Sequence, residues 1–334
     1  MIKIGIVGYG YWGINLLRNF MALPNCQVKT VCDARMERLA IAKKNYPGLE
    51  ITTDYNDLLK DPEITAIVIA TPVFLHFELA KKALLANKNV LVEKPLTGSL
   101  SEANELVELA DKKNLKLAVD HTFLFTGSVQ KIKNLIDNNE FGNIQYFDST
   151  RINLGLFQPD VNVIWDLAPH DISILNYLIP EKPMSVVCTG QSHTKNGIEN
   201  IAFLTVYYNS DFIAHFNCSW ISPVKIRRIL IGGDKKMCLY DDVEPTEKLK
   251  IYDTGFSEVN EEDKHKMLID YRIGDIFIPK ISQKEALSEM AANFVEAIMF
   301  DKTPLVDGKA GLEVVKILEA AQKSINNNGI VVNI

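Results

Sequence analysis

Short apolar runs alternate with stretches of helical periodicity over the first third of the 334-residue chain. In the stretch 74–86, for example, apolar residues recur every three or four positions, which gives one face to lay on a sheet. Alternation of strands with helices predicts βαβ units and a doubly wound parallel sheet. The runs assigned to strands are Lys3 to Val7, Val28 to Cys32, Ala66 to Ala70, Val90 to Val92 and Leu115 to Val119.

The pattern changes after residue 122. Helices are predicted over 129–138 and near 166–178, with a strand over 144–151 between them. Four strand-like runs then follow without an intervening helix, at 202–208, 212–219, 228–231 and 236–240. Consecutive strands indicate a largely antiparallel sheet, so this part is predicted to be α+β. Two helical patterns, 285–299 and 310–325, close the chain.

We therefore predict two domains, at residues 1–122 and 123–334. The first is expected to bind a nucleotide. The second is expected to bind the substrate and to mediate oligomerisation, with its C-terminal helices as candidates for packing back on the first. One helix of the first domain is expected over 101–113, with Ser101 as its N-cap.

Composition narrows the function without naming it. Apolar residues make up 47% and charged residues 23%, as in ordinary folded proteins. The formal net charge of -6 argues against nucleic acid as a partner, because phosphates attract basic surfaces. The five cysteines are scattered without a C-x-x-C pair, and no apolar run is long enough to span a bilayer. We expect a cytoplasmic protein with reduced thiols and with neither a metal site nor a membrane partner.

A glycine motif follows the first predicted strand directly. The segment 8–13, Gly-Tyr-Gly-Tyr-Trp-Gly, fits G-x-G-x-x-G and leads into a helix-compatible stretch. In this context Gly8 permits a tight turn, Gly10 lets the backbone approach a pyrophosphate, and Gly13 allows close helix packing. The first domain is therefore predicted to be a dinucleotide-binding Rossmann domain.

A carboxylate stands where such domains bind the adenosine ribose. Asp33 ends the second predicted strand, twenty residues after Gly13. It would repel a 2′-phosphate, so NAD is favoured as the cofactor and NADP is the less favoured alternative. Arg35 and Arg38 lie close enough in sequence to weaken that preference, because a nearby arginine can accept the phosphate.

Two further segments carry candidate chemistry. Lys94 lies in Glu-Lys-Pro at the end of a predicted strand, where open parallel sheets bind their ligands. Asp166 and His170 are four residues apart on a predicted helix and so share one face. A carboxylate beside an imidazole suits a general acid or base. The other interpretations are a surface lysine, a capping Asp166 with a packed His170, and a metal pair.

Taken together, these motifs resemble the glucose-fructose oxidoreductase, inositol dehydrogenase and rhizopine-catabolism family, Gfo/Idh/MocA. The resemblance extends over nearly the whole chain and also rests on Ala70-Thr71-Pro72 with His76 and on the closing segment 307–313. It implies a catalytic triad of Lys94, Asp166 and His170, with His170 as the acid and base for a sugar or cyclitol hydroxyl. The cofactor-binding residues expected on this basis are Gly8, Gly10, Tyr11, Trp12, Gly13, Asp33, Ala70, Thr71, Pro72, His76, Glu93 and Lys94.

The segments 151–155 and 219–227 are similar to those of family members that oxidise UDP-linked amino sugars at C3. A diphosphate substrate needs cations, and Arg151, Lys225 and Arg227 are the candidates. The substrate-binding residues expected are Arg151, Asn153, Trp165, Lys225 and Arg227. Family resemblance also indicates a homodimer or homotetramer.

Other functions stay open from the sequence alone. An inositol or free-sugar dehydrogenase and a ketosugar reductase would use the same residues. An NAD-dependent glycosidase is a hypothesis from a different class, as is a non-catalytic NAD-responsive binding protein. The combination of Lys94, Asp166 and His170 argues against the binding protein, because a sensor needs no proton transfer.

Overall fold

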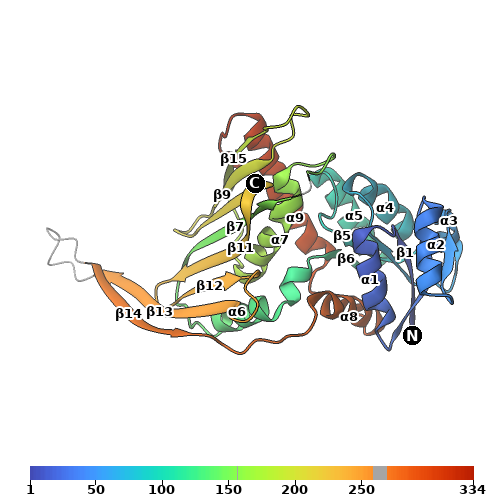
Figure 1. The fold of residues 1–334 in the computed structure, drawn as a ribbon, viewed down its shortest axis with the longest axis horizontal. Coiled ribbons are helices and arrows are strands. Elements are labelled where there is room, and N and C mark those ends of the chain that lie inside the picture. Colours follow the sequence, from blue (N-terminus) through green and yellow to red (C-terminus); the bar gives the residue numbers. More distant parts are fainter. Residues whose placement is uncertain (156, 259–268) are drawn as a thin grey trace. The chain divides into compact units, whose positions relative to one another are not determined.

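The computed structural model describes residues 1–155, 157–258 and 269–334, which form two compact units (Figure 1). The first unit contains residues 1–125 and 284–316. The second contains residues 126–283 and 317–334. The last helix, α9 (Gly308–Asn326), begins in the first unit and ends in the second.

A six-stranded sheet in which all neighbouring strands are parallel forms the centre of the first unit, as the alternating pattern predicts. Its strand order, β3-β2-β1-β4-β5-β6, reverses between β1 and β4. The strands are β1 (Ile2–Val7), β2 (Cys26–Cys32), β3 (Glu50–Thr52), β4 (Ala66–Ile69), β5 (Asn89–Glu93) and β6 (Leu117–Asp120). In such sheets ligands bind beyond the carboxyl ends of the strands at the reversal, so this edge is the place to seek the site.

Helices in the first unit follow the strands in the expected rhythm. Helix α1 begins at Tyr11, shortly after β1, and the side chains of Leu16, Leu17 and Phe20 on it are completely buried. The predicted N-cap at Ser101 is wrong, because α5 already begins at Leu100 and its cap is Ser99, whose side chain accepts the Glu102 N–H. The helices are α1 (Tyr11–Met21), α2 (Met36–Asn45), α3 (Tyr55–Lys60), η1 (Val73–Leu75), α4 (His76–Leu85), α5 (Leu100–Lys113), η2 (Thr122–Phe125) and α8 (Ala286–Met299).

The second unit is built on a nine-stranded sheet with the order β14-β13-β12-β11-β7-β10-β9-β8-β15. Its neighbours are antiparallel except for β7 and β10, which pair in parallel, so the prediction of a largely antiparallel sheet is confirmed. The strands are β7 (Ile144–Leu154), β8 (Ser185–Gln191), β9 (Ile201–Tyr207), β10 (Ile213–Ser219), β11 (Ile221–Gly233), β12 (Met237–Asp241), β13 (Leu249–Glu258), β14 (Ile269–Phe277) and β15 (Val332–Asn333).

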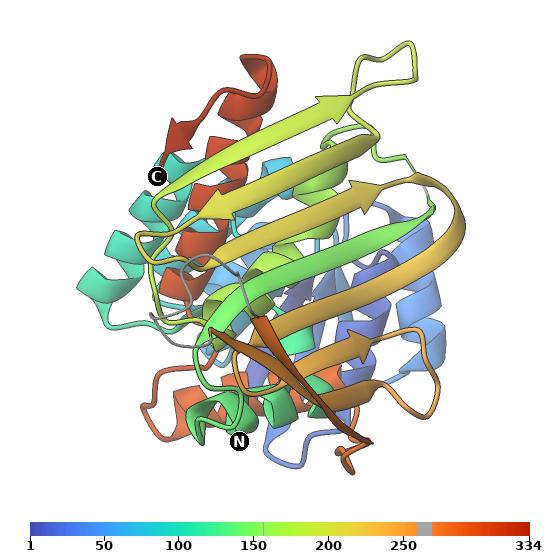
Figure 2. The same cartoon turned by 90° about the vertical axis from the view of Figure 1, so that its left-hand side faces the viewer.

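Helix α7 (Val163–Leu178) packs on one face of this sheet, against β7, β9 and β10, and α6 (Gly127–Asp137) packs beside it. Alternate residues of β9 and β10, such as Leu204 and Phe216, are buried on that face. Figure 2 looks onto the opposite face, where Phe203, Tyr207 and Leu230 are exposed. The sheet therefore has one covered face and one face with apolar side chains open to solvent.

None of the helices in the described ranges is long and apolar enough to cross a membrane.

Candidate active site

The turn after β1 has the geometry that its glycines predict. Gly8 has a φ of +91°, and a Cβ there would lie 2.4 Å from the Ala70 carbonyl oxygen. A Cβ at Gly13 would lie 2.0 Å from the Gly8 carbonyl oxygen, so only glycine fits there. At Gly10, by contrast, an added Cβ would meet nothing within 4 Å. The open position lies where a phosphate is expected to approach.

The first turn of α1 is suited to an anion. Gly10 is its N-cap, and no side chain of the described residues caps the helix there. The first turn also contains no acidic residue. Its N–H groups and helix dipole are therefore available to a pyrophosphate, and this open cradle fits the cofactor that the sequence predicts.

Asp33 lies just beyond β2 and is 5% exposed. Its Oδ2 accepts the Tyr9 N–H at 2.7 Å, and its Oδ1 accepts the Arg35 N–H at 2.9 Å and Nε–H at 3.1 Å. Burial by itself would raise the pKa of Asp33, but the hydrogen bonds from Arg35 and Tyr9 outweigh it and hold this pKa below its usual range. The Asp33 carboxylate is thus ionised and held in place. The guanidinium group of Arg35 lies beside it, as the spacing of the two residues in the sequence suggested.

His76 connects two loops of the first unit. It is fully buried, with Nδ1 2.9 Å from the Pro95 carbonyl oxygen and Nε2 2.8 Å from the Thr71 carbonyl oxygen. The loop after β4 and the loop after β5 are therefore tied together through one ring. His76 is expected to bind the cofactor, and in the structure its buried ring contacts the backbone of these two loops.

Lys94 follows the last residue of β5 and is half-buried. The Lys94 N–H donates to the Glu93 carboxyl at 3.2 Å, and the peptide bond to Pro95 is cis. Glu93, expected among the cofactor-binding residues, is only 7% exposed. Its strand partner is Asp120 at the end of β6, a residue that the sequence analysis did not single out.

In the second unit, Asp166 is not the cap of its helix. Asn162 caps α7, because its side chain accepts the Trp165 N–H at 3.2 Å. The carboxylate of Asp166 instead accepts the Trp220 Nε1–H at 3.0 Å. His170 lies four residues further along α7, so it shares a helix face with Asp166. Trp220 is 1% exposed, which makes it a fixed donor that the sequence analysis missed.

The structure does not support the expected diphosphate contact for Arg151. Its side chain is 5% exposed and binds Asp171 through Nη2 at 2.6 Å and Nε at 2.9 Å, while Ser149 donates to the same carboxylate at 2.7 Å. This buried pair anchors α7 to β7, next to His170 in the sequence. Removing one partner of such a pair typically costs about 3–5 kcal/mol, so its role is structural.

The other expected substrate residues have mixed surroundings. Trp165 is buried and Asn153 is half-buried, whereas Lys225 is exposed. The Nη1 atom of Arg227 lies 3.4 Å from Oδ2 of Asp242, and the Arg227 side chain is 37% exposed. Lys225 and Arg227 are therefore the two expected cations that an anion can reach.

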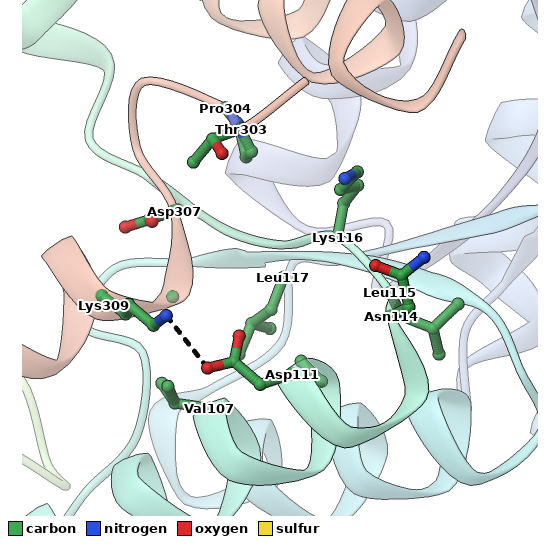
Figure 3. Close-up of a pocket in the computed structure, with 12 residues that line it drawn as sticks. Val107, Asp111, Asn114, Leu115, Lys116, Leu117, Thr303, Pro304, Asp307 and Lys309 are labelled. Carbon is green, nitrogen blue, oxygen red and sulfur yellow. Dashed lines mark ion pairs between the residues drawn. The ribbon is translucent and has the colours of Figure 1, made fainter. Parts of the chain in front are cut away.

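A cavity of about 290 Å³ in the first unit lies away from these residues (Figure 3). It is lined by the start of β6 at Leu117 and by the start of α9, where Lys309 pairs with Asp111 at 3.0 Å. The amino end of β6 is opposite to its carboxyl end at Asp120, so this cavity is not the candidate site. Across the described ranges, no group of three or more His, Cys, Asp or Glu side chains is placed to hold a metal ion.

Comparisons with known proteins agree with this arrangement. A family model described as "Oxidoreductase family, NAD-binding Rossmann fold" (GFO_IDH_MocA) matches residues 2–121. The model "GFO/IDH/MocA C-terminal domain" matches residues 129–238. The first match contains all six strands of the parallel sheet, and the second contains β7 to β11 of the nine-stranded sheet.

Some of the individual relatives are distant in sequence but match nearly the full chain. The uncharacterized oxidoreductase YrbE of Bacillus subtilis is 25% identical over 97% of this chain and 94% of its own length. UDP-N-acetylglucosamine 3-dehydrogenase of Acidithiobacillus ferrooxidans is 24% identical over 94% of both. A solved structure of UDP-N-acetylglucosamine 3-dehydrogenase GnnA from that species has a TM-score of 0.80 at 23% identity and 98% coverage of both chains, which shows a common fold.

The open position at Gly10 gives a direct test of the phosphate cradle. Gly10→Ala should keep the fold, because its Cβ meets no protein atom within 4 Å, and should weaken dinucleotide binding about tenfold or more by filling the approach of the phosphates. Gly13→Ala is the contrasting variant, since its Cβ would lie 2.0 Å from a carbonyl oxygen and should lower the melting temperature as well. Fluorescence titration and thermal melting measure both effects. Undiminished binding by Gly10→Ala would contradict the cradle.

Proposed function

Because the chain belongs to the GFO/IDH/MocA oxidoreductase family, we propose that it transfers a hydride between NAD and C3 of a UDP-linked amino sugar. Members of the family are NAD(P)-dependent oxidoreductases that act on CH–OH groups of sugars. One observation supports the proposed chemistry most strongly: the carboxylate of Asp166 accepts a hydrogen bond from Trp220 one helical turn before His170. The cap of α7 is Asn162, so Asp166 is not needed for that role. A capping aspartate would have no such orientation.

The protein supplies proton transfer and electrostatic stabilisation. The nicotinamide cofactor supplies the hydride acceptor or donor when it is bound. His170 takes the proton of the sugar hydroxyl during oxidation and returns it during reduction. The ammonium group of Lys94 stabilises the alkoxide that develops at the same oxygen. Asp166 orients His170, and Trp220 holds Asp166 through its indole N–H.

We assign the nucleotide to the first unit and the sugar to the second. Asp33 accepts hydrogen bonds from the ribose hydroxyls, and its ionised carboxylate repels a 2′-phosphate. Arg35 already donates to Asp33, which holds its cationic side chain on the carboxylate and limits its use for a phosphate. NAD is therefore the proposed cofactor.

Lys225 and Arg227 near the start of β11 are the proposed ligands of the UDP diphosphate. Their exposure lets them meet an anion, and Arg227 would exchange its Asp242 contact for a phosphate. The similarity to a UDP-N-acetylglucosamine 3-dehydrogenase over 94% of both chains supports this choice of substrate class.

Single and double variants test the catalytic roles proposed for these residues. We expect His170→Ala to lower kcat about 10²- to 10⁴-fold with NAD affinity nearly unchanged, because it removes the acid and base. Lys94→Ala should cost a comparable factor, and the double variant should lose less than the product of the two. Asp166→Asn should be milder, and Trp220→Phe milder still, since it removes only one hydrogen bond. Steady-state rates and NAD titration measure each effect. Full turnover by His170→Ala would contradict the mechanism.

Nucleotide preference depends on Asp33 and its neighbour. The native protein should bind NAD at least about tenfold more tightly than NADP, a difference of about 1.4 kcal/mol. Asp33→Ala should reduce that ratio, because the repulsion of the 2′-phosphate is lost. Arg35→Ala should increase it, because the nearest cation is removed. Calorimetric titration with both nucleotides gives the ratios, and tighter binding of NADP by the native protein would refute the assignment.

A UDP-linked substrate predicts a strong dependence on the nucleotide part. UDP-N-acetylglucosamine should have a kcat/KM at least about 10²-fold above that of N-acetylglucosamine or inositol, because remote binding energy positions the reacting carbon. Lys225→Ala with Arg227→Ala should lower kcat/KM for the UDP sugar only. Lys235→Ala, an exposed lysine at the other end of β11, is the matched control. Equal efficiency with free inositol would favour an inositol dehydrogenase instead.

We also propose a homodimer or homotetramer formed through the open face of the second unit's sheet. Phe203, Tyr207 and Leu230 expose apolar surface there, which a second copy of the chain would bury. Multi-angle light scattering should report at least two chains per particle, and Phe203→Glu with Leu230→Glu should shift the protein toward a monomer. A native protein that is monomeric at micromolar concentration would overturn this proposal.

A further inference from the structure

Two buried carboxyl groups lie side by side at the carboxyl edge of the first unit's sheet. Glu93 ends β5, Asp120 ends β6, and the two residues are direct partners in the parallel register of these strands. Glu93 is 7% exposed and Asp120 is 4% exposed. The Glu93 Oε1 atom is buried and has no hydrogen-bond partner among the residues that the structure describes.

A single proton on the pair accounts for its burial. Two ionised carboxylates in contact inside a protein repel each other, so one of them keeps its proton. Burial and then the charge of Asp120 raise the pKa of Glu93 well above its usual range. Burial also raises the pKa of Asp120, whereas the hydrogen bond that Asp120 accepts from the Thr122 hydroxyl favours its ionised form. Because Asp120 accepts a hydrogen bond from Thr122 and Glu93 Oε1 accepts none among the described residues, the proton is assigned to Glu93 and the negative charge to Asp120.

The charge of the pair acts on Lys94. The Lys94 ammonium favours the ionised form of both carboxyl groups, and its N–H also donates to Glu93. His121, the next residue after Asp120, is 1% exposed and offers no counter-charge. Burial and the charge of Lys94 lower the pKa of His121 to about 3, so its ring is neutral. Neither ring nitrogen has a hydrogen-bond partner among the residues that the structure describes.

We propose that Glu93 and Asp120 are positioning residues that hold one shared proton and place one negative charge beside Lys94. The effect on catalysis rests on the role proposed above for Lys94. The shared proton itself does not, since it follows from the register and burial of the two strands.

The pair predicts an unusual pattern of substitutions. Glu93→Gln copies the protonated acid and leaves the charge on Asp120. Asp120→Asn leaves Glu93 able to ionise and to accept a hydrogen bond from the new amide. Each single variant therefore keeps one negative charge, whereas Glu93→Gln with Asp120→Asn keeps none. A pair that only fills space would show no such difference between the single and double variants.

Infrared spectroscopy of the nucleotide-free protein tests the shared proton directly. At neutral pH the native protein should show the C=O stretch of a protonated carboxylic acid, and Glu93→Gln should lose it. Glu108→Gln, which changes an exposed glutamate of α5, should keep the band. Isotopic ¹³C labelling of glutamate carboxyls should shift the band in the native protein, so this test does not depend on any variant folding. Absence of the band, or a band that survives in Glu93→Gln, would overturn the proposal.

The pH dependence of kcat tests the effect on Lys94. Whatever their kcat, the single variants should keep the alkaline limb of the native profile, whereas the double variant should have this limb moved down by about one to three pH units, the usual effect of losing a neighbouring opposite charge. Thermal melting checks that the variant is folded. A folded double variant with the native profile would overturn the role of the charge. Failure of the function proposed above would appear separately, as native turnover by Lys94→Ala with the infrared band still present.

Discussion

The parallel pairing of the strands in the first unit is the constraint on which the rest of the site depends. Because β1, β4 and β5 run in the same direction, their carboxyl ends meet at one edge of the sheet. Gly8 can follow β1 there only because a glycine tolerates a φ of +91° and the approach of the Ala70 carbonyl. His76 then ties the loops after β4 and β5 to each other. The parallel pairing thus places the glycine turn after β1 and Lys94 after β5 at the same edge of the sheet.

The second unit positions its chemistry by a different means. A buried pair of Arg151 and Asp171 holds α7 on β7, and the Trp220 indole binds Asp166 from the junction of β10 and β11. Burying an ion pair costs desolvation free energy, so its value lies in fixing one arrangement of helix and sheet. We infer that His170, which lies between Asp166 and Asp171 in the sequence, takes its orientation from both contacts.

The sequence predicted the features that depend on local pattern. The Gly8 turn, the parallel sheet and the antiparallel character of the second sheet follow from glycine spacing and from the alternation of strands and helices. The parallel pairing of β7 with β10 could not be read in this way, because strand order depends on long-range packing. Asn162 does carry a signal, because asparagine is a preferred N-cap, but aspartate is preferred there as well, so Asp166 is an equally good candidate from the sequence.

Contacts between distant residues were beyond the sequence. Trp220 is 54 residues from Asp166 and meets it only through the fold. A sequence shows the charge of Arg151 but not its burial, so it predicts a phosphate ligand where the structure has a buried ion pair with Asp171. The contact of Asp120 with Glu93 depends on the register of β5 and β6, which the sequence does not show. The site was thus predictable where it uses backbone turns and strand ends, and unpredictable where it uses paired side chains.

Transfer of the hydrogen atom at C3 of the sugar to the nicotinamide tests the proposed hydride transfer. UDP-N-acetylglucosamine carrying deuterium at C3 should be incubated with the protein and NAD, and the nucleotide should be analysed by mass spectrometry. The account predicts that reduced nicotinamide forms and carries the deuterium, because the hydride leaves C3 as the hydroxyl proton leaves. Reduced nicotinamide without deuterium, or no reduced nicotinamide at all, would contradict it.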